Sequence, residues 1–158
     1  MSRYEEGITI LEERCGKGKE TIISLATMAV EPNGDEKMHP GIRYVCAYYE
    51  DGIFYVVTSA KSEKMRHIAQ NPTVAVTACF EWFCGVGTGE NLGWILESKN
   101  AELRDKLRTA FASWYEEESH EEDENCCILA IRLAKGTIIT DHGVAPYKMD
   151  FVNKVETS

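Results

Sequence analysis

Hydrophobic and polar positions follow two different periods along the chain, and the change of period predicts a set of short strands between helices. In residues 4–15 the apolar side chains Ile8, Leu11 and Cys15 recur at helical spacing, and Gly16 then ends the pattern. This predicts an amphipathic first helix. Further along, runs of β-branched and apolar residues predict strands over 21–30, 38–49, 53–58, 73–80, 84–97, 126–133 and 137–140.

Turn residues separate these strands at short intervals. Asp51 and Gly52 lie between two β-rich runs and predict a tight hairpin, while the Pro-Asn-Gly-Asp sequence at 32–35 predicts a loop between the first two strands. Pro40 and Gly41 stand early in the second strand. Because proline cannot donate to a sheet ladder, they predict either an edge position or a bulge there.

Two more helices are predicted, and together with the strands they indicate a fold class. A short helix spans residues 62–70, and a long one begins at Ser98 or Asn100. The long helix is expected to pack on the sheet through Leu103, Leu107, Ala110, Phe111 and Trp114. A doubly wound parallel sheet would need a helix after almost every strand. We therefore predict a mainly β (α+β) chain, a closed or half-closed antiparallel barrel with peripheral helices, in one domain over residues 1–158.

The negative charge of the chain is concentrated in one segment. The net charge is −9, but residues 116–124 carry seven acidic side chains, and with these set aside the balance is only −2. Such a block is predicted to be a disordered, solvated insertion, and the alternative is a lid that folds over a ligand. We see no basic face for nucleic acid and no run long enough to span a membrane.

The cysteines and histidines show no metal-binding or triad pattern. No Cys-x-x-Cys pair occurs among Cys15, Cys46, Cys79, Cys84, Cys126 and Cys127. Most of them lie in apolar strand patterns, and the start of the chain has no apolar secretion region, so a reducing cytoplasm is predicted. The histidines are His39, His67, His120 and His142, and none of them lies near a Gly-x-Ser-x-Gly turn or in a His-Glu-x-x-His motif. No Gly-x-Gly-x-x-Gly fingerprint follows a predicted strand and precedes a helix, so a Rossmann nicotinamide site is not predicted.

One strand-to-helix junction carries the residue types that bind a phosphate. Thr58 ends a predicted strand, and Ser59 follows it in the turn. Ser62 stands at the predicted N-cap, and Lys64 lies in the first helical turn. Backbone N–H groups at the start of a helix lack intrahelical partners, and the helix dipole is positive there, so an anion is attracted. The alternative interpretation is that Ser62 only caps the helix and the lysines are solvated.

The order of these segments resembles the pyridoxamine 5'-phosphate oxidase-like, FMN-binding split-barrel family. The resemblance covers about residues 21–90 and rests on residues 24–27, 55–59, 61–64, 71–76 and 87–90. It implies a split antiparallel β-barrel and a homodimer that binds FMN at the dimer interface through both subunits.

The resemblance also implies a role for individual residues. The implied ligands of the FMN phosphate are Thr58, Ser59, Ser62 and Lys64. Val57 would lie against the flavin ring, and Arg43 in the preceding strand would be a second cation near the phosphate. Trp82 stands where the oxidase has a glutamine that reaches the ring from the partner chain. A tryptophan there would stack on the ring, shield it, or fill the interface.

Departures from the oxidase itself narrow the functional hypothesis. The oxidase has an arginine- and serine-bearing segment after its barrel, for the phosphate of the vitamin substrate, and an Arg-x-His motif near its C-terminus. Neither is visible in this chain. Arg132 is followed by Leu133 and Ala134, and His142 has no arginine two residues before it. Our main hypothesis is an FMN-dependent oxidoreductase with a small-molecule redox substrate or a nicotinamide donor, similar to general stress proteins and small flavin reductases. One alternative is a module that stores, carries or senses flavin, deazaflavin or haem without turnover. Another is a barrel dimer that has lost its ligand.

Overall fold

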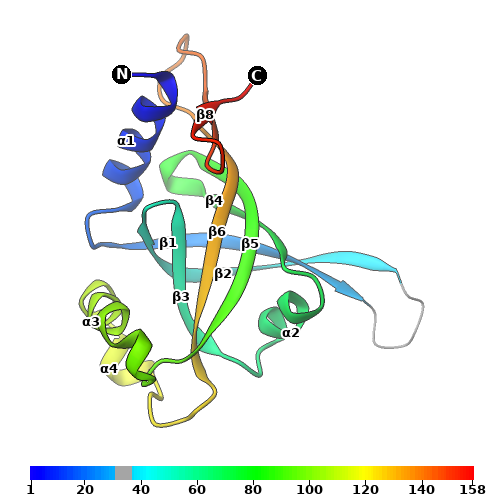
Figure 1. Ribbon diagram of the computed structural model, residues 1–158, viewed down its shortest axis with the longest axis vertical. Coiled ribbons are helices and arrows are strands. Elements are labelled where there is room, and N and C mark those ends of the chain that lie inside the picture. The colour runs from blue at the N-terminus through cyan, green and yellow to red at the C-terminus, as the bar shows by residue number, and fades with distance from the viewer. Residues whose placement is uncertain (31–36) are drawn as a thin grey trace.

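The computed structural model describes residues 1–30 and 37–158, and its centre is a closed barrel of six antiparallel strands (Figure 1). These strands are β1 (Glu20–Val30), β2 (Met38–Glu50), β3 (Ile53–Ser59), β4 (Thr73–Ala78), β5 (Phe83–Trp94) and β6 (Cys126–Ile138). They follow the order β3-β2-β1-β4-β5-β6, and a pairing of β3 with β6 closes the ring. The predicted antiparallel barrel is therefore confirmed.

The barrel is split between β2 and β3. These two strands pair at only three positions beside their hairpin, whereas β3 pairs with β6 along all seven of its residues. Asp51 and Gly52 both have positive φ angles, 49° and 80°, as a two-residue type I′ turn requires. The predicted hairpin is thus confirmed, and the strands diverge beyond it.

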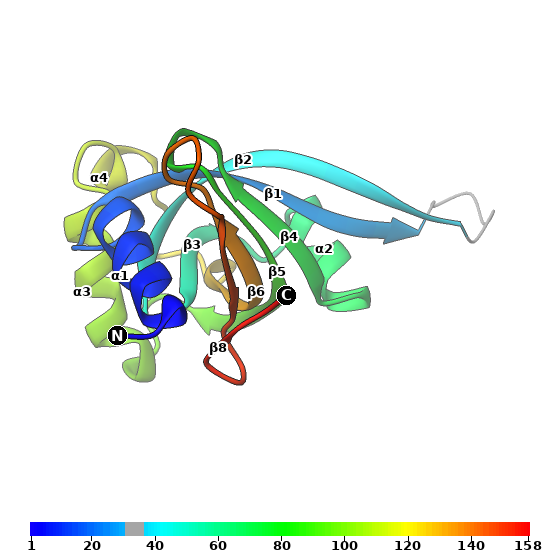
Figure 2. The same cartoon turned by 90° about the horizontal axis from the view of Figure 1, so that it is seen from above.

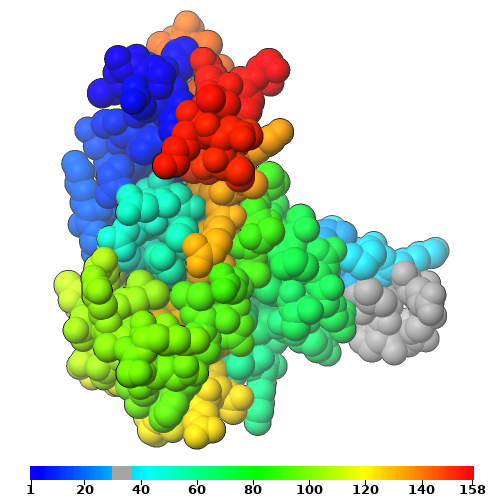
Figure 3. Space-filling view, viewed as in Figure 1, coloured from blue at the N-terminus to red at the C-terminus, as the bar shows by residue number. Residues whose placement is uncertain are grey.

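On the other side of the barrel, β1 and β2 continue together as a two-stranded arm (Figure 2). In Figure 3 the cyan end of β2 stands clear of the molecular body. The pairing of β1 with β2 runs without a register shift through Met28 and Pro40, so the predicted bulge is wrong. Among the described residues β2 has only β1 as a neighbour there, which confirms the edge position. The predicted loop at 32–35 lies outside the described residues.

Helices cover the outside of the barrel. Helix α1 (Arg3–Cys15) begins with a capping box between Ser2 and Glu5 and buries Leu11 and Cys15, as the periodicity predicts. Helix α2 (Glu63–Gln70) follows β3 and packs against β1. The predicted long helix is shorter than expected: α3 (Ala101–Ala110) ends at Phe111, and a separate turn of helix, α4 (Tyr115–Glu118), follows.

Asn100 precedes α3 but does not cap it with its side chain. Its amide instead donates hydrogen bonds to the carbonyl oxygens of Leu92 and Trp94 in β5, at 3.2 and 2.9 Å. Beyond this anchor, Leu107 and Phe111 are fully buried against the sheet, together with Tyr48, Ile95, Tyr115, Cys126 and Ile128. The expectation that the helix packs on the sheet is therefore confirmed.

The acidic segment is more ordered than the sequence predicts. Its first residues belong to α4, and the carboxylate of Glu121 accepts hydrogen bonds from Arg104 and from the Tyr115 hydroxyl. The backbone carbonyl of Glu121 accepts a further bond from the Trp94 indole at 2.7 Å. Acidic side chains in this segment therefore pack on α3 rather than forming a disordered insertion.

The C-terminal third also differs from the prediction. Residues 126–138 form the single strand β6 where two strands were expected, because Lys135 and Gly136 remain in the ladder opposite β5. Gly136 allows close packing rather than a turn, since a Cβ at this position would lie 2.6 Å from the Phe83 ring. Beyond β6, two further short strands follow that were not predicted, β7 (Tyr147–Asp150) and β8 (Val155–Glu156).

Candidate functional site

The predicted phosphate-binding junction lies at the end of the split. Val57, Thr58 and Ser59 are the last residues of β3, where they pair with β6. Ser62 is the N-cap residue of α2, and Lys64 lies in the first turn of that helix. The local fold of the junction is therefore the one that the sequence predicts.

Two adjoining cavities surround this junction. The first, which we call the split cavity, has a volume of about 220 Å³ and is lined by Val45, Cys46, Val56, Val57, Thr58, Lys64 and Trp114. The second, of about 260 Å³, shares Val57, Thr58 and Trp114 with it and is also lined by Ser59, Glu118, Ser119, His120, Asp123 and Cys126. Four of the seven predicted site residues, Val57, Thr58, Ser59 and Lys64, thus line these two adjoining cavities.

Lys64 is a half-buried cation without an acidic partner. Its side chain lines the split cavity, and no ion pair or hydrogen bond involves it within residues 1–30 and 37–158. Burial lowers the pKa of Lys64, and the positive charge of Arg43 lowers that pKa further. The charge of Arg43 therefore acts on Lys64 at the start of α2, and an anion there would offset this repulsion.

Ser62 contributes an unsatisfied hydroxyl to the same place. Its Oγ is buried and has no hydrogen-bond partner among the described residues, and it makes no side-chain cap on α2. The interpretation that Ser62 only caps the helix is therefore wrong. The hydroxyl of Ser59 instead accepts a bond from the backbone N–H of Lys61 at 3.2 Å. A buried hydroxyl without a hydrogen-bond partner is rare in native proteins, so this one is a candidate donor or acceptor for a ligand.

Arg43 stands opposite Leu25 of β1, and its guanidinium is anchored on one side. Nη1 donates to the carbonyl oxygen of Leu25 at 3.1 Å and to Oγ1 of Thr27 at 2.6 Å. Nη2 lies 3.7 Å from the carboxylate of Glu63, which is longer than a hydrogen bond. The exposed side chain of Glu63 therefore balances this charge only weakly, and Nη2 stays available for another acceptor.

Trp82 is the one predicted residue that does not join the others within a chain. It is 66% exposed and precedes β5, whose first residue pairs with Ile138 at one end of β6. Thr58 pairs with Cys127 at the other end. At about 3.3 Å per residue these two ends are roughly 36 Å apart along the strand.

Trp114 is a cavity residue that the sequence did not reveal. The sequence places it in the apolar stripe of the long helix, but the helix ends before it and the indole reaches the split cavity. The ring stacks on Phe111 at 4.9 Å, and its Nε1 donates to the carboxylate of Glu20 at 3.1 Å. No local pattern signals this role, because it depends on how α3 meets the barrel.

Solved structures of other proteins share this fold. A heme-binding protein from Mycobacterium smegmatis aligns with a TM-score of 0.63 at 15% identity, over 98% of this chain and 60% of that protein. A FAD-binding protein from Mesorhizobium loti aligns at 0.57 and 15%, over 84% and 90% of the two chains. A Clostridium acetobutylicum protein of the pyridoxinephosphate oxidase family, related to general stress protein 26, aligns at 0.56 and 14%, over 98% and 99%.

By sequence, neither a protein-family model nor a curated protein matches the chain. Among the described residues there is no cluster of histidine, cysteine and carboxylate side chains that would hold a metal ion. The helices that the structure describes are all too short or too polar to cross a membrane. The chain thus has the split-barrel fold seen in the pyridoxamine 5'-phosphate oxidase-like proteins, and the predicted resemblance is confirmed at the level of the fold.

Proposed function

We propose that this chain binds FMN through its phosphate at the split cavity and acts as an FMN-dependent oxidoreductase. One observation carries the proposal: in the described part of the chain the half-buried Lys64 has no ion-pair partner, the positive charge of Arg43 acts on it, and the buried hydroxyl of nearby Ser62 has no hydrogen-bond partner. Removing a cation from water is costly unless an anion compensates for it. A phosphate ester matches this donor set, because it offers negative charge and several acceptor oxygens.

The remaining residues fit the rest of an FMN molecule. Val57 and the Trp114 indole offer apolar surface beside the split cavity, and the two cavities together reach the size of an ordinary ligand site. Bound FMN would supply hydride or single-electron transfer. The chain itself would bind the phosphate, exclude water from the ring and decide which small molecules or nicotinamide donors reach it. No side chain needs to act as a general acid or base.

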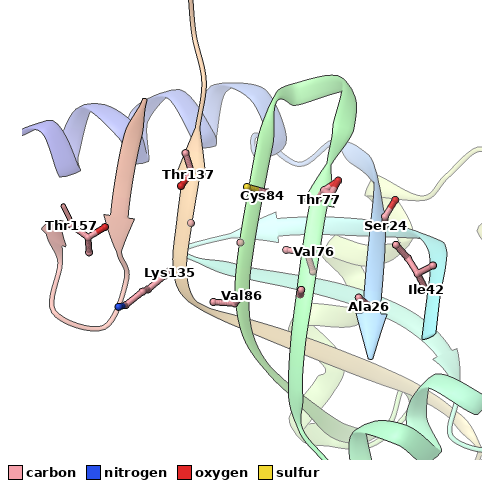
Figure 4. A pocket seen from close by; sticks show the side chains of 13 residues that line it. Ser24, Ala26, Ile42, Val76, Thr77, Cys84, Val86, Lys135, Thr137 and Thr157 are labelled. Carbon is pink, nitrogen blue, oxygen red and sulfur yellow. The ribbon is translucent and has the colours of Figure 1, made fainter. Parts of the chain in front are cut away.

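We also propose that the site is completed by a second copy of the chain. The outer face of β1, β4 and β5 carries a cavity of about 540 Å³ whose lining includes only one charged residue, Lys135 (Figure 4). Ile42 and Tyr44, on the same face of β2, are 71% and 80% exposed. A large uncharged face of this kind suits a symmetric, self-complementary contact. Trp82 is also remote from Lys64 within one chain. If Trp82 contacts the flavin, it must therefore come from the partner chain.

The cofactor proposal is tested by the absorbance spectrum of the freshly purified protein, with mass spectrometry of whatever denaturation releases. We expect a yellow protein that releases FMN, loses its colour on addition of NADH or NADPH and regains it in air. A protein that stays yellow with every electron donor would be a flavin carrier, and this result would contradict the proposed oxidoreductase activity. A colourless protein that does not take up added FMN would contradict both.

The partner proposal is tested by mixing two inactive variants. Lys64→Met removes the phosphate cation from one chain and Trp82→Ala removes the indole from another. In a mixed dimer, one site would then carry both changes and the other none. Half of randomly mixed dimers contain one chain of each variant, and one of the two sites in such a dimer carries neither change. About one site in four overall should therefore regain wild-type affinity. No recovery on mixing, with dimers confirmed by sedimentation, would contradict a site shared between chains.

The second candidate function is haem binding or storage without turnover, and one feature of the structure favours it. His120 lines the second cavity, and imidazole is a common axial ligand of haem iron. A heme-binding protein also shares this fold. Titration with hemin should then give a Soret band that is lost in His120→Ala. An unchanged band in that variant would exclude His120 as the ligand.

We further propose a reducing, cytoplasmic location. All six cysteines in the described part of the chain are unpaired, and burial raises the pKa of the Cys46 and Cys127 thiols to about 11, so these thiols stay protonated and unreactive at neutral pH. Fractionation of the native cell should recover the protein in the cytoplasm with all thiols free. Recovery of a disulfide-bonded form would contradict this location.

A further inference from the structure

A buried polar network connects the Arg43 guanidinium to the inside of α2. Thr27 is 1% exposed and His67 is 5% exposed, so neither can contact a ligand directly. Oγ1 of Thr27 accepts a hydrogen bond from Nη1 of Arg43 at 2.6 Å and lies 2.8 Å from Nδ1 of His67. Three side chains from β1, β2 and α2 thus meet at a single hydroxyl.

The direction of the bonds in this network follows from donor and acceptor chemistry. Arginine can only donate, so the hydroxyl of Thr27 is the acceptor of the Arg43 bond. The hydroxyl proton then has Nδ1 of His67 as its acceptor, because that is the other polar atom within hydrogen-bond distance. His67 is therefore neutral, with its proton on Nε2, which faces Glu63 at 3.8 Å.

We propose that Thr27 and His67 are positioning residues that hold Arg43 ready for the phosphate. Their bonds fix Nη1 and leave Nη2 directed toward the first turn of α2, beside Glu63 and near Lys64. A guanidinium that is held in place before binding loses less conformational freedom when the anion arrives. This inference rests on the proposed phosphate site, and it adds two buried residues that touch no ligand.

The space around Arg43 is consistent with this positioning. Gly41 lies two residues before Arg43 on β2, and a Cβ there would come within 3.1 Å of Nη2 and 3.6 Å of the His67 ring. A larger residue at position 41 would therefore crowd the guanidinium and the imidazole together. The glycine, from which the sequence predicts only an edge position or a bulge, also leaves room for the network.

The first experiment needs no ligand and tests the network itself. Proton–nitrogen correlation spectra of the wild-type imidazoles should show His67 with an unprotonated Nδ1 and a protonated Nε2 at pH 7. Thr27→Val removes the hydroxyl at nearly constant shape and should change the Nδ1 shift of His67. A proton on Nδ1 in the wild type, or an unchanged shift in the variant, would overturn the inference.

The second experiment separates positioning from folding by comparing FMN with riboflavin, which lacks the phosphate. His67→Leu should lower the affinity for FMN by about tenfold and leave that for riboflavin unchanged. His67→Asn should restore FMN binding, because its Oδ1 takes the place of Nδ1 as acceptor. His142→Asn, at an exposed position, is the matched control and should change neither affinity.

The outcomes of this comparison distinguish the two proposals. If the wild-type protein binds FMN and riboflavin equally, the phosphate site itself is contradicted, whatever the spectra show. If the wild type prefers FMN, the phosphate site is supported. The positioning role is then overturned if His67→Leu keeps that preference, or if His67→Asn fails to restore it.

Discussion

Two regions of the molecule hold a partly buried cation in opposite ways. At the acidic segment, Arg104 donates through Nε and Nη2 to both carboxylate oxygens of Glu121, each at 2.7 Å. At the split, the positive charge of Arg43 lowers the pKa of Lys64, and the ion pair of Arg43 in the described residues is a 3.7 Å contact with Glu63. One region balances its charge within the chain, and the other does so only weakly among the described residues, which is why we propose an anion there.

The pKa shifts show the same contrast. The hydrogen bond from Arg104 holds the pKa of Glu121 below its usual value, and Glu121 in turn raises the pKa of Arg104. At the split, burial lowers the pKa of both Lys64 and Arg43. The first arrangement favours both charged states and so stabilises the fold. The second arrangement disfavours the charged states of Lys64 and Arg43, as the proposed anion site requires.

The largest expected effect is on the affinity for FMN. Lys64→Met removes the positive charge that lines the split cavity. It should weaken FMN binding at least tenfold, because a charge-assisted hydrogen bond contributes roughly 1.5–3 kcal/mol. The free energy of unfolding of the apoprotein should stay the same or rise, since a half-buried cation is removed. Fluorescence titration and urea unfolding measure the two quantities.

The matched control for this change is Lys61→Met, which removes an exposed lysine from the same turn. It should leave FMN affinity within about twofold of the wild type. Equal losses in both lysine variants would mean that the general charge of the turn, rather than the position of Lys64, attracts the ligand.

The opposite result is expected in the acidic segment. Glu121→Gln leaves the Arg104 guanidinium without its carboxylate and should lower the free energy of unfolding by about 1–2 kcal/mol. Affinity for FMN should not change. Glu122→Gln, next to it and exposed, should alter neither quantity. A Glu121→Gln protein as stable as the wild type would show that this ion pair does not anchor the segment.

The same pair should make stability depend on pH with a known sign. The pKa of Glu121 is lower in the folded state than its ordinary value of 4.5, so its contribution is fully present above pH 4.5. That contribution is lost as the pH falls through the folded-state pKa. The difference in unfolding free energy between wild type and Glu121→Gln should therefore be constant above about pH 4.5 and shrink as the pH falls below that value. A difference that also stays constant below that value would contradict the assignment.

The smallest effect is expected at Ser62. Its buried hydroxyl has no partner in the described chain, so Ser62→Ala should leave the stability of the apoprotein unchanged or slightly higher. Affinity for FMN should fall by about threefold to tenfold, since one hydrogen bond from an uncharged donor to the phosphate is lost. Thermal unfolding with and without FMN would show both. A variant that is less stable without ligand would mean that the hydroxyl has a partner in the protein.

The sequence predicts those features that local chemistry determines. The Asp51–Gly52 hairpin, the first helix and the junction from Thr58 to Lys64 follow from turn residues, periodicity and capping positions, and all are present in the structure. The break after Ala110 and the continuity of β6 through Gly136 depend instead on packing between distant segments. Local propensity contains no information about such contacts.

The same distinction applies within the site. Lys64 and Ser62 lie close in sequence to the end of β3, so the sequence alone predicts their position. Trp114 reaches the split cavity only because α3 packs on the barrel, and the bond between Thr27 and His67 joins residues forty positions apart. These contributions became visible only once the strands and helices were placed in space.

The most direct test of the phosphate site is to titrate the wild-type apoprotein with FMN and with riboflavin under the same conditions. If Arg43, Lys64 and Ser62 bind the phosphate, FMN should bind at least about tenfold more tightly than riboflavin, and added salt should narrow the gap. Equal affinities for the two flavins, at low and at high salt, would contradict the site.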